Sequence, residues 1–183
     1  GAHAGEHRRL QNPAPGVGAA SFSGAEPKVA FIHGPPVAEL DARGPYGKPN
    51  RNGAEVVARE DVRPKNGVYP KNWLDRRDVA TDRPTMPGAH RGGTHRHEYT
   101  LDGKRIGFTY DDFLLPEYGR TIGYMEPHPQ APEPASHYFV LLVSVVPGGT
   151  AEPGEIETAL GDSWVGRHGH MRAFIGKVRN EDG

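Results

Sequence analysis

Tyr99-Thr100-Leu101-Asp102-Gly103-Lys104-Arg105-Ile106-Gly107-Phe108 is the stretch that indicates the fold. Its Asp-Gly pair lies between two strand-like runs and predicts a tight β-hairpin, because both central residues of a type I′ turn need positive φ. The stretch from Phe22-Ser23 to Val29-Ala30-Phe31 has the same order of features: an aromatic residue, a hydroxyl residue, a turn-rich gap, a basic residue and a short apolar run. We therefore expect antiparallel hairpins over residues 21–32 and 94–110. Repeated hairpins are typical of repeating all-β folds.

Composition also favours an all-β protein with many loops. The 25 Gly and 18 Pro among 183 residues interrupt nearly every apolar run, so no long segment keeps a helical period. Residues 137–146 are almost wholly apolar and predict a strand buried on both faces. Residues 124–134 are rich in Pro and predict an extended loop, while residues 155–160 predict one short helix from the spacing of their apolar side chains. Further short strands are predicted at residues 55–59, 72–79 and 172–178.

The second hairpin resembles a known family. Residues 101–109 are similar to the blade signature of TolB-like β-propellers, Ser-x-Asp-Gly-Lys-x-Ile-x-Phe, with Leu101 at a position usually held by Pro. Four further segments resemble an uncharacterised bacterial group within that class: FIHGP (31–35), PGAHRGGTHRH (87–97), FTYDD (108–112) and SWVG (163–166). A more distant resemblance is to oligogalacturonate lyase, a propeller whose histidines hold a divalent metal. The resemblance implies WD40-like repeats and a periplasmic location.

The length of the chain limits how much of a propeller it can hold. A blade takes about 40 to 50 residues and a closed ring needs four or more blades, so 183 residues correspond to two to three blades. We therefore expect a fragment, with residues 1–20 as a loop or the end of a preceding blade and residues 21–183 as a partial propeller. A strand at 172–178 followed by a turn at 180–183 suggests that the chain stops within a hairpin.

Thr94-His95-Arg96-His97-Glu98 is the main candidate site. Residues two apart in a strand point to the same side, so His95 and His97 would present two imidazoles together, as ligands for Zn, Mn, Fe or Ni. His33 ends the second strand of the first hairpin, and in a propeller that position lies at the same mouth of the channel. The predicted metal ligands are therefore His33, His95 and His97. The alternative is that these imidazoles only form hydrogen bonds, between blades or, for His33, within a turn.

Two further groups of charged residues are weaker candidates. Asp111 and Asp112 could act in acid–base chemistry, but adjacent residues of an extended chain point to opposite sides, which favours a role in capping a loop. Arg76, Arg77 and Arg83 could bind the carboxylate of an acidic sugar through bidentate hydrogen bonds, with a solvated surface as the alternative.

Charge and hydropathy exclude two classes of partner. The 22 basic and 23 acidic residues nearly cancel and give no field that would attract nucleic acid. No apolar run is long enough to span a membrane. Three interpretations remain: a binding module that takes a protein or oligosaccharide at the channel face, a metal-dependent lyase for acidic oligosaccharides, and a purely structural blade fragment without a site. In the lyase, Mn, Zn or Fe would hold the uronate carboxylate and acidify the neighbouring proton, which a base would remove.

Overall fold

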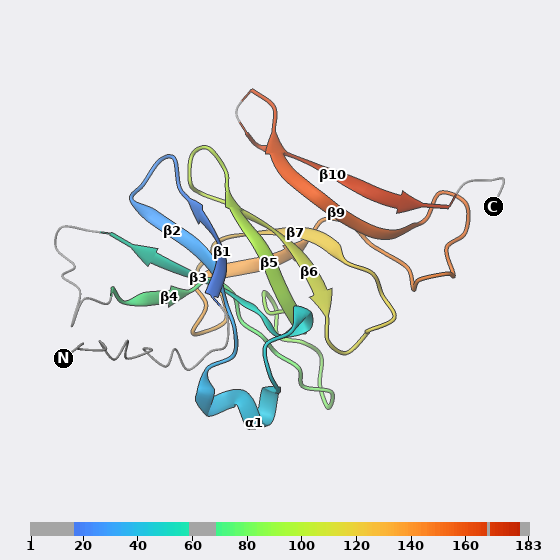
Figure 1. Ribbon diagram of the computed structural model, residues 1–183, viewed down its shortest axis with the longest axis horizontal. Helices are drawn as coiled ribbons and strands as arrows, with labels where there is room; N and C mark the ends of the chain where they lie inside the picture. Colours follow the sequence, from blue (N-terminus) through green and yellow to red (C-terminus); the bar gives the residue numbers. More distant parts are fainter. Residues whose placement is uncertain (1–16, 59–68, 168, 180–183) are drawn as a thin grey trace, which may run out of the picture.

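The computed structural model describes residues 17–58, 69–167 and 169–179, which form three antiparallel sheets (Figure 1). The first sheet has the order β1 (Val17–Phe22), β2 (Lys28–His33), β3 (Asn52–Val57), β4 (Lys71–Trp73). The second has the order β5 (Gly92–Tyr99), β6 (Ile106–Asp112), β7 (Thr121–Pro127), β8 (His137–Leu141), and the third contains β9 (Ile156–Val165) and β10 (Met171–Val178). Three short helices connect β2 to β3: η1 (Val37–Glu39), α1 (Leu40–Arg43) and η2 (Lys48–Asn50). The predicted all-β class is confirmed, although the described sheets do not close into a ring.

Both predicted hairpins are present, as β1–β2 and β5–β6. The second turn is wider than the predicted type I′ turn, because Tyr99 pairs with Ile106 and residues 100–105 form the connection. Gly103 has a φ of 70°, whereas Asp102 does not have a positive φ. The Asp102 carboxylate instead accepts hydrogen bonds from the Thr100 hydroxyl at 2.7 Å and the backbone N–H of Lys104 at 3.1 Å. Asp102 therefore stabilises the turn through its side chain.

The helix predicted at residues 155–160 is wrong, since these residues belong to β9 or immediately precede it. β9 pairs with β10 along most of its length, and this ladder outweighs the local helical spacing of apolar residues. The strand predicted at 172–178 is confirmed. It pairs with β9 as the second strand of a hairpin, and the turn predicted at residues 180–183 lies outside the described residues.

Other element boundaries also differ from the predictions. β1 begins at Val17, inside the segment 1–20 predicted as loop, and residues 1–16 lie outside the described part of the chain. β7 extends to Pro127, where the missing N–H of proline removes only a terminal ladder bond. The apolar run 137–146 forms a strand only as far as Leu141. This strand is the edge of its sheet and Leu141 is 45% exposed, so it is not buried on both faces.

The first strand of each sheet contains a β-bulge at the same place. The bulges lie between Gly18 and Ser21 in β1, between His95 and Glu98 in β5, and between Leu160 and Ser163 in β9. In each bulge, the two flanking paired residues are three positions apart on the first strand and two positions apart on its partner, so the first strand has one extra residue. The residue that follows the last paired position before each bulge has a positive φ: 49° at Ala19, 54° at Arg96 and 64° at Gly161. Among the described residues the hairpin repeat therefore has three copies, of which the sequence indicated two.

The three hairpins lie next to one another. β1 contacts β5, and β5 contacts β9. The hairpin loops also meet, with Gly103 beside the Ser23 side chain and Gly169 beside Leu101. Figure 1 shows these loops at one end of the molecule and α1 at the other. β5 also contacts the connection between β2 and β3, where the Thr94 N–H donates to the carbonyl of Arg51.

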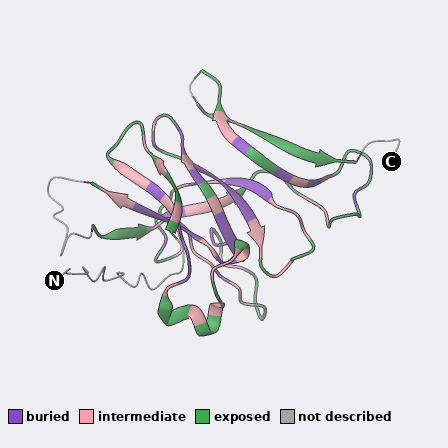
Figure 2. Ribbon diagram, viewed as in Figure 1, coloured by how far each residue is buried: buried purple, intermediate pink, exposed green. Residues whose placement is uncertain are grey.

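The hydrophobic core lies between the first two sheets. Its fully buried members include Leu74, Ile106, Phe108 and Met125, and the ring of Phe139 stacks on that of Phe108 at 4.7 Å between centroids. Figure 2 shows this burial on β5, β6 and β7, in contrast to the largely exposed β10. Within the described residues, no helix is both long and apolar enough to cross a membrane.

Candidate functional site

The predicted ligand His33 lies at the end of β2, as expected, but its ring is engaged locally. Its Nδ1 donates to the carbonyl of Gly34 at 2.6 Å, and the ammonium of Lys71 lies 2.6 Å from Nε2. The edge of the ring contacts Trp73 at a centroid distance of 4.9 Å. Burial lowers the pKa of His33, and the charge of Lys71 lowers it further, so the imidazole is neutral at neutral pH.

His95 and His97 lie on β5, but the bulge at Arg96 separates them, so the simple alternation of side chains does not apply. His95 is half-buried, and its pKa is lowered to about 4 by burial and by the charges of Arg51 and Arg120. His97 is 1% exposed, and burial lowers its pKa to about 4. In the described ranges, no group of three or more His, Asp or Glu side chains is placed to hold a metal ion. The metal role of His33, His95 and His97 stays a prediction.

Asp75, which the sequence did not single out, is the centre of a buried polar network beneath β5. Its Oδ1 accepts from Asn52 Nδ2 at 2.6 Å, and its Oδ2 accepts from Thr94 Oγ1 at 2.5 Å and from the backbone N–H of Gly53 at 2.9 Å. His90 Nε2 lies 3.5 Å from the same Oδ2. Burial raises the pKa of Asp75, but the interaction with His90 and the hydrogen bond from Thr94 outweigh burial and bring it to about 2.

This network assigns the protonation of His97. Thr94 donates its hydroxyl proton to Asp75, so its oxygen accepts the hydrogen bond that links it to His97 Nε2 at 3.0 Å. Nε2 therefore carries the proton, and Nδ1 is left with a lone pair. Nδ1 is buried and has no hydrogen-bond partner in the described part of the chain. His97 is thus a neutral imidazole whose free nitrogen can accept a hydrogen bond.

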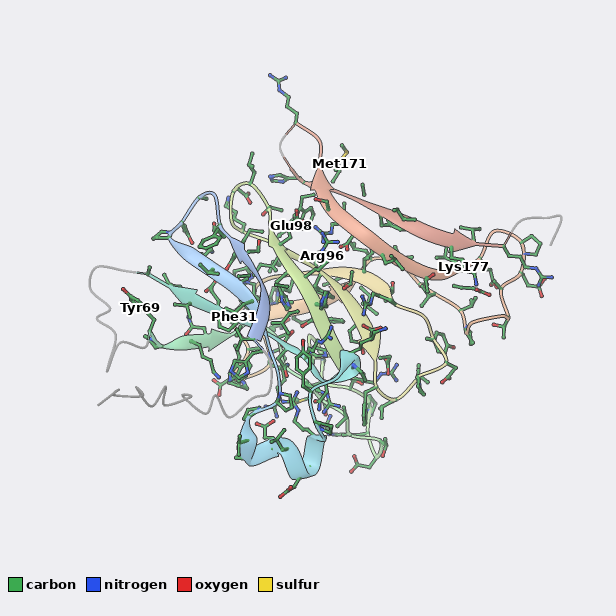
Figure 3. The ribbon with its side chains drawn as sticks, viewed as in Figure 1. Phe31, Tyr69, Arg96, Glu98, Met171 and Lys177 are labelled. Atoms are coloured by element: carbon green, nitrogen blue, oxygen red, sulfur yellow. The ribbon has the colours of Figure 1, made fainter. Side chains whose placement is uncertain are left out.

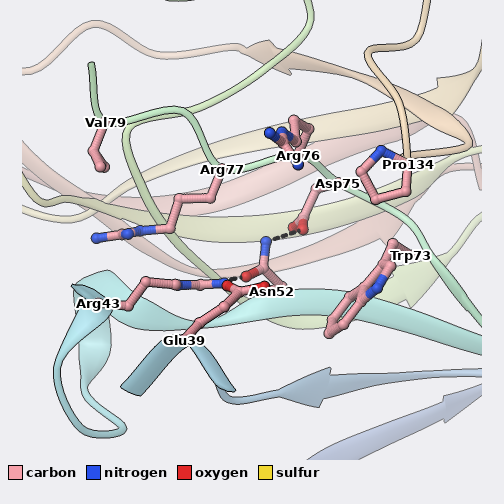
Figure 4. A pocket seen from close by; sticks show the side chains of 9 residues that line it. All are labelled: Glu39, Arg43, Asn52, Trp73, Asp75, Arg76, Arg77, Val79 and Pro134. Carbon is pink, nitrogen blue, oxygen red and sulfur yellow. Dashed lines mark hydrogen bonds and ion pairs between the residues drawn. The ribbon is translucent and has the colours of Figure 1, made fainter. Parts of the chain in front are cut away.

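A cleft of about 270 Å³ lies beside Asp75 at the α1 end (Figure 4). Its lining combines basic, acidic and aromatic side chains: Glu39, Arg43, Asn52, Trp73, Asp75, Arg76, Arg77, Val79 and Pro134. These residues come from α1 and its neighbouring turn, from β3 and β4, and from the connections that follow β4 and precede β8. Only the packing of separate connections brings them together, and Arg76 and Arg77 are the only lining residues that the sequence indicated.

The three arginines of the cleft differ in how many of their N–H groups have a hydrogen-bond acceptor. Arg43 donates to Glu39 at 2.8 Å and to Asn52 Oδ1 at 2.6 Å. Arg77 stacks on Phe113 at 4.7 Å, and burial together with the charge of Arg43 lowers its pKa to about 10. Nε of Arg76, and Nε and Nη2 of Arg77, are buried without a hydrogen-bond acceptor among the described residues. Because buried guanidinium N–H groups are normally paired, these groups could donate hydrogen bonds to an anion.

The remaining candidates have structural partners. Arg83 forms a bidentate pair with Asp78, at 2.7 and 2.9 Å, and does not line the cleft. Asp112 accepts from the backbone N–H groups of Leu114 and Leu115, so its loop-capping role is confirmed. Asp111 pairs with Arg120 at 2.8 Å.

The family model of a protein of unknown function, DUF3748, matches residues 16–131. The chain belongs to the DUF3748 family. It is also 31% identical to the uncharacterized protein YidR of Escherichia coli K12, over 99% of this chain and 43% of YidR. The chain therefore spans less than half the length of this relative. No solved structure matches it. The DUF3748 match contains the first two hairpins and every residue of the cleft except Pro134, while the resemblance to TolB-like propellers and to oligogalacturonate lyase stays a prediction.

Proposed function

We propose that this DUF3748 chain forms blades of a β-propeller that binds a carboxylate-bearing saccharide in the cleft of Arg43, Arg76 and Arg77. The observation that carries the proposal is that Arg76 and Arg77 hold buried N–H groups without acceptors at the same cleft as the indole of Trp73. A carboxylate would accept these N–H groups in a bidentate manner, and the apolar C–H face of a sugar ring packs well on an indole.

The repeat supports the propeller part of the proposal. The first two sheets are four-stranded antiparallel meanders, which is the usual form of a propeller blade. Their first strands and β9 are neighbours and carry the same bulge. In a propeller these strands line the central channel, and the cleft lies among the connections at one end of them.

Isothermal titration calorimetry with glucuronate and with glucose tests the binding proposal. We expect saturable binding of glucuronate and none of glucose, because only the first has a carboxylate. Arg77→Gln should weaken glucuronate binding by about tenfold or more, as a charge-assisted hydrogen bond contributes about 1.5–3 kcal/mol. Lys104→Gln is the matched control, since it removes one positive charge from an exposed hairpin loop and should leave the affinity unchanged.

Equal binding of both sugars, or an Arg77→Gln variant with unchanged affinity, would contradict the proposal. Binding of an acidic peptide in place of glucuronate would indicate a protein partner. If incubation with oligogalacturonate and Mn²⁺ releases product that absorbs in the ultraviolet, the protein is a lyase and not only a binding module. The periplasmic location is tested separately, by fractionating cells that express the full-length protein.

A further inference from the structure

A second cavity lies between the bulges of β1 and β5, away from the arginine cleft. It has a volume of about 200 Å³ and is lined by three residues of each bulge: Ala19, Ala20, Ser21, Arg96, His97 and Glu98. None of these residues lines the cleft. A bulge leaves one residue out of the strand ladder, so polar backbone groups on both walls are free to contact a ligand.

Arg96 occupies a backbone conformation that suits glycine. At the same position of the three bulges the chain has Ala19, Arg96 and Gly161, all with positive φ. An L-residue with a side chain is strained in this region, and such strain often accompanies a functional site. The third copy shows that the repeat accommodates glycine at this position. The exposed side chain of Arg96 (Figure 3) therefore belongs to a residue whose backbone conformation is strained.

The other charged residue of the cavity, Glu98, is engaged by the third hairpin. Its carboxylate accepts hydrogen bonds from Ser163 Oγ at 2.8 Å and from Arg172 Nη1 at 2.6 Å, and Arg172 is shared with Asp162. His97 is neutral at neutral pH, because burial lowers its pKa to about 4, and its Nε2 donates to Thr94. Arg96 forms no ion pair with another described residue, and Ser21 adds a hydroxyl donor to the lining.

We propose that the cavity between the β1 and β5 bulges is a binding site for a small oxyanion, a phosphate or a carboxylate, held by the guanidinium of Arg96. The planar guanidinium binds two oxygens of such a group at once. The site is independent of the arginine cleft, because the two share no lining residue.

The test is an NMR titration of the whole chain with inorganic phosphate and, in a separate arm, with acetate. We expect saturable shifts of the amide signals of residues 19–21 and 96–98 with at least one of the anions, and the stronger response identifies the preferred oxyanion. Arg96→Gly should weaken this binding by about tenfold or more while raising the melting temperature by about 2–4 °C, because it removes the strain at positive φ.

Lys104→Gln is the matched control, because Lys104 is exposed on a hairpin loop and does not line the cavity. It removes one positive charge, as Arg96→Gly does, and should leave anion binding at the cavity unchanged. Arg77→Gln, which alters only the arginine cleft, should likewise leave the shifts at 96–98 intact. The inference is wrong if Arg96→Gly binds as tightly as the parent chain, if neither anion gives saturable shifts, or if the shifts occur only at the arginine cleft.

Discussion

Asp75 shows at the scale of single residues how this chain accommodates a buried charge. The carboxylate is 2% exposed, and an ion of this kind is costly to bury unless its oxygens are hydrogen-bonded. Three donors from two strands meet it, Asn52 and Gly53 of β3 and Thr94 of β5, and Nε2 of His90 lies 3.5 Å from Oδ2. Asp75 thereby joins the wall of the arginine cleft to Thr94 on β5.

The histidines make stability depend on pH at the same scale. His97 has a pKa of about 4 in the folded chain against 6.5 in the unfolded chain, because burial disfavours its charged form. Between these values the unfolded chain binds the extra proton, so the free energy of unfolding should fall as pH decreases from about 6.5 to 4, by up to about 1.4 kcal/mol per pH unit for each such histidine. His95 and His137 shift in the same direction, also to about 4.

Urea unfolding across this pH range measures the effect. The His97→Gln variant should show a shallower dependence on pH than the parent chain, with the contributions of His95 and His137 remaining. Asp75 titrates below this pH range. Because its pKa is lowered to about 2, its contribution to the free energy of unfolding is lost only as pH falls from about 4 to 2. Identical pH slopes for both proteins would show that His97 is not buried as described.

At the scale of elements, the bulge is what the three hairpins share, and it changes the direction of the first strand at the same point in each copy. Bulges are common beside functional sites because they redirect side chains. In β5 the bulge carries Arg96 to the surface and is followed by the buried His97. In β9 it is followed by Asp162, which is 2% exposed and pairs with Arg172.

Gly161→Ala tests the bulge of β9. The glycine has a φ of 64°, and an added Cβ would lie 3.2 Å from Cδ1 of Ile175. We expect a loss of about 1–2 kcal/mol in the free energy of unfolding, measured by urea denaturation, because an L-residue is strained at positive φ. Gly18→Ala is the control: it lies at the start of the β1 bulge without a positive φ and with nothing within 4 Å of the added Cβ, so it should cost much less. Equal losses in both variants would contradict this explanation.

Glu98 links the third hairpin to the second sheet through hydrogen bonds. Besides its carboxylate bonds to Ser163 and Arg172, its carbonyl accepts from the indole N–H of Trp164 at 2.8 Å. Glu98→Gln keeps the shape but removes the charge that pairs with Arg172. Hydrogen exchange should then speed up in β9 and β10 and stay unchanged in β6 and β7, with a local loss of about 1 kcal/mol. Faster exchange across the whole chain would mean that Glu98 supports the core instead.

At the scale of the whole molecule, burial is uneven. The first two sheets share a core, whereas β10 leaves Met171 62%, Ile175 68% and Val178 46% exposed. β10 also pairs on one side only within the described residues. An apolar strand with a free edge is a template for pairing with another strand.

We therefore expect this chain to self-associate in isolation. Size-exclusion chromatography with light scattering should show a mass that rises with protein concentration. Ile175→Lys should reduce this association, because a charged side chain on an edge strand opposes pairing, while Lys104→Gln should not. A compact monomer at every concentration would contradict both this prediction and the proposal that the chain supplies blades to a larger ring.

The sequence by itself determined the all-β class and the first two hairpins, because Asp102, Gly103 and the apolar runs beside them act over only a few residues. Tertiary structure alone decided the rest. Residues 156–160 have helical spacing but are strand because β10 lies beside them, and the bulges at Ala19 and Arg96 exist only in register with a partner strand. The cleft joins Arg43, Trp73 and Arg77 from separate segments, and Asp75 gains its hydrogen-bond partners from residues distant in the chain. Local preferences select a turn or a strand, whereas a site depends on contacts between residues far apart in the chain, which the packing of the sheets creates.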